Sequence, residues 1–89
     1  MAHRDVTIIN RLGLHARATA KLVRCAAAFS ARVELERDGR RVDAKSIMAV
    51  MMLAAGPGTA LRIFADGRDA EPALDALEQL IASRFGEAE

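Results

Sequence analysis

The sequence predicts a two-layer α+β domain, and three observations support this fold class. Four segments have the alternating or β-branched composition of strands, and three have the apolar spacing of amphipathic helices. Their order along the chain is β-α-β-β-α-β-α. The alternating strands have one polar face, so we expect water on one side of the sheet and the helices on the other.

The first half of the chain is expected to contain three strands and one helix. Residues 5–9 are mostly β-branched and predict a strand, and residues 16–29 carry an apolar stripe at helical spacing. Strict alternation predicts a second strand over residues 32–37. The Asp-Gly pair at positions 38–39 favours a hairpin turn because glycine tolerates positive φ, so residues 40–43 are the expected return strand.

The second half is expected to contain a short helix, a strand and a longer helix. Ser46 is a favourable N-cap for the methionine-rich run at residues 47–53, and the Gly-Pro-Gly sequence at 56–58 ends that helix. Residues 60–66 alternate as a strand. Asp69 is expected to cap the last helix, and the three residues at the end of the chain are expected to fray. The apolar stripe of the last helix consists of Leu74, Leu77, Ile81 and Phe85.

Length and composition exclude several classes of function. At 89 residues and 9.6 kDa, the chain is expected to form one domain over residues 1–89. Its single cysteine excludes an internal disulfide and a cysteine-based zinc site, and no ligand spacing indicates a metal or a cofactor. The chain has neither the apolar run of a membrane span nor that of a signal peptide, so we expect a cytoplasmic protein without membrane insertion.

Charge and aromatic content argue against a nucleic-acid partner. Lys and Arg number 13 against 12 Asp and Glu, which gives a net charge of +1. Three Phe and no Trp or Tyr offer few rings for base stacking. A carrier, adaptor or regulatory module, expected to be monomeric, fits this size better than a metabolic enzyme with its own substrate pocket.

The sequence Gly-Leu-His-Ala-Arg at residues 13–17 forms the first candidate site. His15 is expected at the N-cap of a helix, where the free N–H groups of Ala16 and Arg17 attract negative charge. The positive helix end disfavours imidazolium, so the ring is expected to stay neutral and nucleophilic near pH 7. Arg17 adds a planar cation suited to phosphate. An arbitrary histidine is more often a surface or core residue, but a nucleophilic imidazole beside an anion site is what a phosphohistidine requires.

The second candidate site begins at Lys45 and Ser46. Part of the methionine-rich run must lie in the core, but one short helix cannot bury all of its sides, and exposed Met suits docking to several partners. Ser46 is either a helix cap or a phosphorylation site, and the sequence alone favours the cap. We expect the docking face to consist of Ala20, Arg24, Lys45, Ile47, Met48 and Met51.

Together, the sequences at residues 13–17 and 45–48 resemble HPr, the histidine-containing phosphocarrier family of the bacterial phosphotransferase system. Their separation, the length and the element order match the family over nearly the whole chain. The resemblance implies an open-faced β-sandwich, in which a four-stranded antiparallel sheet carries three helices on one face. It also implies that Enzyme I phosphorylates Nδ1 of His15, that Arg17 contacts the phosphate, and that a IIA protein receives the phosphoryl group.

The resemblance also implies that Ser46 is the position modified by HPr kinase/phosphorylase in many such proteins. Two residues depart from the family pattern. Many members have Pro where this chain has Ala18, and both residues suit the first turn of a helix. Leu12 stands where sugar-branch members often have Asn or Ser, and is similar to the nitrogen-regulatory branch.

Three classes of function therefore stay open. The first is a phosphoryl carrier, in either the sugar or the nitrogen branch. The second is a kinase-controlled adaptor in which His15 is vestigial and Ser46 carries the signal. The third is an unrelated small binding module, for example for RNA, and the charge balance and the few aromatic residues weigh against it.

Overall fold

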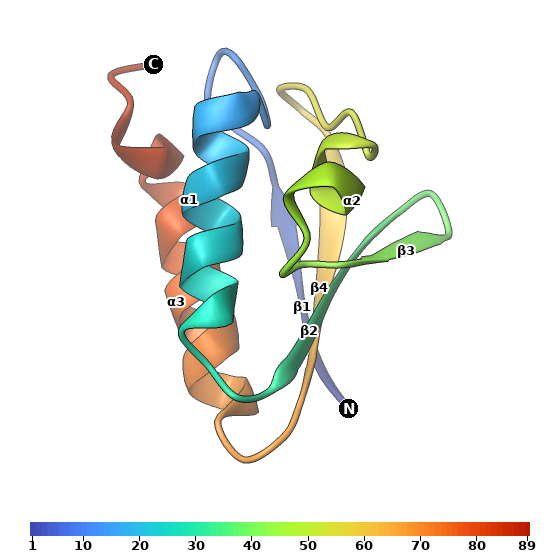
Figure 1. Ribbon diagram of the computed structural model, residues 1–89. Helices are drawn as coiled ribbons and strands as arrows, with labels where there is room; N and C mark the ends of the chain where they lie inside the picture. Colours follow the sequence, from blue (N-terminus) through green and yellow to red (C-terminus); the bar gives the residue numbers. More distant parts are fainter.

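The computed structural model describes residues 1–89 and has the expected order of elements (Figure 1). One antiparallel sheet has the strand order β1-β4-β2-β3, and consists of β1 (Ala2–Thr7), β2 (Arg32–Arg37), β3 (Arg40–Asp43) and β4 (Ala60–Asp66). One face of this sheet carries the helices α1 (Ala16–Ala27), α2 (Ile47–Met51) and α3 (Ala70–Ala82), and the 3-10 helix η1 (Arg84–Gly86) follows. This arrangement confirms the predicted α+β open-faced sandwich. None of the helices combines the length and the apolar character needed to cross a membrane.

The sheet has one buried and one solvated face, as its alternating strands predict. On β4, Leu61, Ile63 and Ala65 are buried, whereas Arg62 between them is exposed. Leu35 of β2 is paired with Ile63 and is buried on the same face. Burial of each Leu or Ile side chain stabilises the fold by about 1.5–3 kcal/mol. The helices supply the other half of this core through Leu22, Val23, Ala26, Leu74, Leu77 and Ile81.

Several boundaries differ from those expected. The first strand covers Ala2–Thr7 instead of residues 5–9, because its pairing with β4 begins at Ala2 opposite Ala65. Helix α1 ends at Ala27 rather than at residue 29. Helix α2 ends at Met51 rather than at residue 53, and the chain then enters the left-handed region at Ala54, where φ is 52°.

The end of α3 differs most. The expected helix continued to Phe85, but α3 ends at Ala82, and both Arg84 and Phe85 have left-handed φ values of 57° and 56°. This reversal turns the Phe85 side chain back into the core, where it is 1% exposed. Phe85 is therefore buried as predicted, but from a turn and not from a helical stripe.

The Asp69 side chain links the start of α3 to the loop that follows α1. Asp69 is the N-cap residue of α3 as expected, but its carboxylate makes no bond to that helix. It accepts hydrogen bonds from the backbone N–H of Ser30 at 2.9 Å and of Ala31 at 2.7 Å, in the loop between α1 and β2. These bonds, the first above all, hold the pKa of Asp69 below its ordinary value.

Gly13 lets the loop before α1 lie directly against the backbone after α2. The backbone N–H of Leu14 donates to the carbonyl of Ala55 at 2.9 Å. A Cβ atom on Gly13 would lie 2.7 Å from that carbonyl oxygen and 2.8 Å from Cα of Gly56, and the φ of Gly13 is +64°. Only glycine satisfies both the close approach and the left-handed backbone.

We expect Asp69→Asn to lower the melting temperature at neutral pH and to flatten its dependence on acid. The pKa of Asp69 is lower in the folded chain than its ordinary value of 3.8. The ionised carboxylate therefore contributes stability that is present above that value and is lost as the pH falls through the lowered pKa. Thermal unfolding between about pH 2 and pH 7 measures this contribution. Asp66→Asn, an exposed neighbour, is the matched control, and a parent-like acid profile in Asp69→Asn would contradict the assignment.

Gly13→Ala is expected to destabilise the fold more than Gly39→Ala. Both glycines have positive φ, so both changes incur the left-handed cost of about 1–2 kcal/mol. Only Gly13 has backbone within 3 Å of the added Cβ, because Gly39 has nothing within 4 Å. Overpacking at Gly13 adds about 1–3 kcal/mol, measurable by denaturant unfolding. Equal losses in the two variants would show that the loop has room to move.

Candidate functional site

His15 lies at the N-terminus of α1, as its sequence context predicts. It is the N-cap residue, with φ −71° and ψ 176°, and its side chain makes no capping hydrogen bond. The N–H groups of Ala16 and Arg17 begin the helix and have no acceptor within it. The first turn carries no acidic residue, so the positive end of the helix is not neutralised from within α1.

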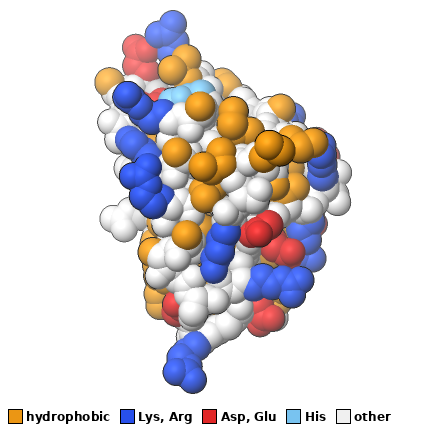
Figure 2. Space-filling view, viewed as in Figure 1, with side chains coloured by type: hydrophobic (Ala, Val, Ile, Leu, Met, Phe, Trp, Pro, Cys, Tyr) orange, Lys and Arg blue, Asp and Glu red, His pale blue; other side chains and the backbone are white.

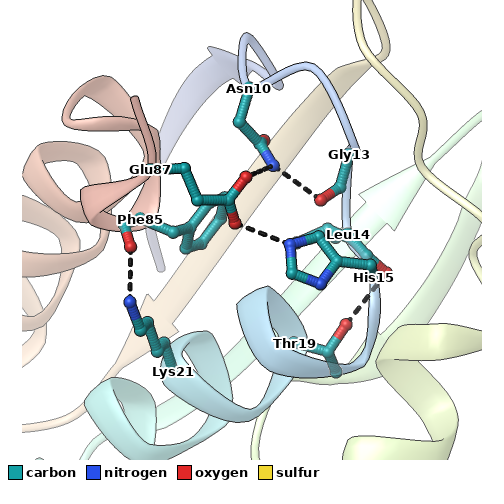
Figure 3. A network of polar contacts seen from close by, with 8 residues as sticks. All are labelled: Asn10, Gly13, Leu14, His15, Thr19, Lys21, Phe85 and Glu87. Atoms are coloured by element: carbon teal, nitrogen blue, oxygen red, sulfur yellow. Dashed lines mark hydrogen bonds and ion pairs between the residues drawn. The ribbon is translucent and has the colours of Figure 1, made fainter. Parts of the chain in front are cut away.

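The imidazole of His15 is paired with a carboxylate from the far end of the chain (Figure 3). Nε2 of His15 lies 2.6 Å from Oε2 of Glu87, 72 positions away in the sequence. The other carboxylate oxygen of Glu87 accepts a hydrogen bond from Nδ2 of Asn10 at 3.1 Å. The end of the chain was expected to fray, and at Glu87 that expectation is wrong. Glu87 is too far from His15 in the sequence for any local pattern to indicate that the two side chains meet.

The Glu87 contact determines which ring nitrogen of His15 is free. The hydrogen bond with His15, and then that with Asn10, hold the pKa of Glu87 below its ordinary value, so its carboxylate is ionised at neutral pH. An ionised carboxylate only accepts hydrogen bonds, and the facing Nε2 must therefore carry the proton. In the neutral ring Nδ1 then keeps its lone pair, and it points away from Glu87 (Figure 3).

Arg17 is exposed on the first turn of α1, and its side chain forms no ion pair or hydrogen bond within the chain. Its guanidinium is therefore available to an anion that binds beside the ring. A hollow of about 650 Å³ surrounds the two side chains. It is lined by Arg11, Leu12, His15, Arg17, Glu87, Ala88 and Glu89.

The short helix α2 presents an apolar surface near this hollow. We call Ile47, Met48, Met51 and Met52 the α2 face; all four are exposed, and Met48 is 75% exposed. Val50 of the same helix is fully buried, so the methionine-rich run is divided between core and surface as expected. Figure 2 shows hydrophobic side chains gathered over α2, on the same side of the molecule as a histidine near the start of α1.

The other residues of the expected docking face lie on or beside α1. Arg24 is exposed and Ala20 is half-buried, and α1 packs against α2. Lys45 is less free than expected, because its Nζ donates to the backbone carbonyl of Phe29 at 2.8 Å. The α2 face also includes Met52, which the expected set omitted.

Ser46 is the N-cap of α2, and this prediction is confirmed. Its Oγ accepts a hydrogen bond from the backbone N–H of Ala49 at 3.3 Å. The side chain is half-buried and adjoins the exposed Ile47. A group attached to this oxygen would therefore border the α2 face.

Known proteins share this fold and most of this sequence. Residues 2–83 match the family described as PTS HPr component phosphorylation site. The chain is 60% identical over 89 residues to the phosphocarrier protein HPr of Cupriavidus necator, and the match covers all of both chains. It is 49% identical over 87 residues to the phosphocarrier protein HPr of Xylella fastidiosa, which covers 98% of each chain.

Solved structures agree with these relatives. The crystal structure of HPr-C-His from Thermoanaerobacter tengcongensis has a TM-score of 0.97 and 42% identity, and the match covers all of both chains. A crystal structure of an HPr dimer from the same organism has a TM-score of 0.79 and 42% identity, over 98% of this chain and 100% of that one. Sequence and fold agree over the full length, and the chain therefore belongs to the HPr family of phosphocarrier proteins of the phosphotransferase system.

Proposed function

We propose that Nδ1 of His15 accepts a phosphoryl group from Enzyme I and passes it to a IIA protein. The observation that carries the proposal is the contact between Nε2 and Glu87, because it leaves Nδ1 as the nitrogen with a free lone pair. The exposed guanidinium of Arg17 and the free N–H groups at the start of α1 supply the anion site beside it.

The transfer forms one bond to phosphorus and breaks another. The lone pair of Nδ1 forms the new bond to phosphorus while the bond from phosphorus to the donor's leaving group breaks, and that group departs with the electron pair. Arg17 and the N–H groups of Ala16 and Arg17 stabilise the charge on the phosphoryl oxygens. In transfer to a IIA protein, the acceptor forms a bond to phosphorus, the N–P bond breaks, and Nδ1 regains its lone pair.

Both partners are proposed to dock on the same surface, formed by the α2 face with Ala20 and Arg24. The α2 face is apolar and exposed, and Met side chains adapt to partners of different shape. The cations Arg17 and Arg24 are exposed at its edge, while Lys45 is held by the backbone carbonyl of Phe29, just after α1. Acidic partners would therefore associate at rates that fall as the salt concentration rises. We expect the carrier to be monomeric when it docks.

Leu12 bears on the choice between the two branches of the system. Its side chain is 66% exposed and lines the same hollow as His15, so a partner that reaches Nδ1 also contacts it. An apolar side chain there favours an acceptor with an apolar surface at that point. Leu12 thus supports the alternative to a sugar-branch carrier, which is a nitrogen-branch carrier with the same chemistry.

Ser46 is proposed as the regulatory position, modified by HPr kinase/phosphorylase where that enzyme is present. A phosphoryl group there adds a charge of about −1.5 to −2. Ser46 adjoins the apolar α2 face, so the added charge lies where partners would bury their surface. Acidic partners would then meet a like charge, which weakens docking without a change of fold.

Phosphorylation by Enzyme I tests the carrier function directly. The parent chain, incubated with Enzyme I and phosphoenolpyruvate, is expected to gain an acid-labile phosphoryl group that His15→Ala lacks. The fold should survive, because the His15 side chain makes no capping hydrogen bond that the change would remove. His3→Ala is the matched control, since His3 lies on the exposed face of β1. An acid-labile phosphoryl group that persists in His15→Ala would exclude His15 as the acceptor, and a parent that gains none would favour the adaptor.

Ser46→Asp is expected to slow phosphorylation of His15 relative to Ser46→Ala, by roughly three- to tenfold. Asp still offers an oxygen to the N–H of Ala49, so the cap survives while a negative charge enters the docking surface. The rate of Enzyme I-dependent phosphorylation and the melting temperature are measured on both variants. Equal rates would reject electrostatic exclusion, and a collapse in the melting temperature of Ser46→Asp would show that this position does not accept charge.

A further inference from the structure

The last residues of the chain return to His15 and hold a carboxylate against its ring. We propose that Glu87 is a positioning residue for phosphoryl transfer: it keeps the proton on Nε2, orients Nδ1 toward the partner, and balances the positive charge that forms on the ring. This inference rests on the proposed function of His15.

The tail is anchored on both sides of Glu87. Before it, the left-handed turn at Phe85 places that side chain in the core, and its carbonyl accepts a hydrogen bond from Nζ of Lys21 at 2.6 Å. After it, the carbonyl of Glu89 accepts a hydrogen bond from the backbone N–H of Arg11 at 2.9 Å. Glu87 is thus held at a fixed position between two attachments to the body of the molecule.

The carboxylate of Glu87 is also oriented by a buried side chain. Asn10 is fully buried and its Nδ2 donates both to Oε1 of Glu87 and to the backbone carbonyl of Gly13, the latter at 2.7 Å. The same amide therefore links the tail to the loop that carries His15 (Figure 3). The paired side chains are 29% exposed for His15 and 19% for Glu87, so water competes only weakly with their contact.

The chemistry of transfer gives this contact a role. When Nδ1 attacks phosphorus, its lone pair becomes the N–P bond and a positive charge spreads over the ring. Nε2 keeps its proton throughout, and the carboxylate of Glu87 accepts that hydrogen bond more strongly as the charge forms. A carboxylate does the same for the imidazole of a serine-protease triad, although there the ring acts as a base.

The hydrogen bonds of Glu87 with His15 and Asn10 dominate the pH dependence of this pair, and other charged groups face it. Arg17 and Lys21 come from α1, Arg11 from the preceding loop, and Glu89 from the tail itself. The pKa of Glu87 lies below its ordinary value of 4.5, so the contact is present at neutral pH and is lost as acid protonates the carboxylate.

Two variants and a matched control test the inference in the full chain. Glu87→Gln keeps the size and an acceptor oxygen but removes the charge, and Glu87→Ala removes the contact. Phosphorylation by Enzyme I is expected to be about five- to tenfold slower in Glu87→Gln and slower again in Glu87→Ala. Glu71→Gln removes the same charge outside this hollow, in the first turn of α3, where Glu71 contacts Arg4 at 3.0 Å, and should stay within about twofold of the parent.

A spectroscopic measurement separates positioning from a structural role. In the unphosphorylated parent, NMR should detect a proton on Nε2 of His15 that exchanges slowly with water, and this signal should be lost in Glu87→Ala. Parent-like rates in both Glu87 variants, or a retained signal in Glu87→Ala, would overturn the inference while His15 remained the acceptor. Loss of rate in Glu71→Gln to the same extent would attribute the effect to net charge and also overturn the inference. If the parent accepts no phosphoryl group, the proposed function fails first, and the role of Glu87 fails with it.

Discussion

Gly13 lies so close to the backbone of Ala55 and Gly56 that the loop before α1 and the loop after α2 are held as one unit. The hydrogen bond from Leu14 to Ala55 closes this contact at 2.9 Å. Since His15 comes two residues after Gly13, the contact fixes where α1 begins and how far its N-terminus lies from α2. The His15 ring, the free end of a helix and an apolar surface are thereby placed on one side of the molecule (Figures 1 and 2).

A small carrier that meets two partners in turn would need a reactive group held in one orientation. It would also need a docking surface whose side chains can adapt to both partners. The structure divides these properties between two segments. His15 is held by the backbone of its loop and by Glu87, whereas the α2 face consists of Ile47 and three flexible Met side chains, on and directly after a five-residue helix. The open side of the sheet contributes to neither segment.

Local sequence patterns predicted the structural features that depend on residues close together in the chain. Alternation indicated the buried face of β4, and the N-cap position of His15 followed from the start of an apolar stripe. The division of the α2 run between Val50 in the core and Met48 at the surface followed from the small size of one helix. Side-chain contacts between distant segments could not be predicted in this way, because the spacing of residue types along the chain does not indicate which segments meet in the fold. The carboxylate of Asp69 bonds a loop 38 positions away, and that of Glu87 bonds a ring 72 positions away.

In the proposed function, Glu87 keeps the proton on Nε2 of His15 and leaves Nδ1 free to react. The most direct measurement is the nitrogen atom that carries the phosphoryl group, identified by phosphorus and nitrogen NMR after reaction with Enzyme I and phosphoenolpyruvate. We expect a phosphoryl group on Nδ1, with a proton retained on Nε2 facing Glu87. A phosphoryl group on Nε2, where the structure places the Glu87 carboxylate at 2.6 Å, would contradict this expectation.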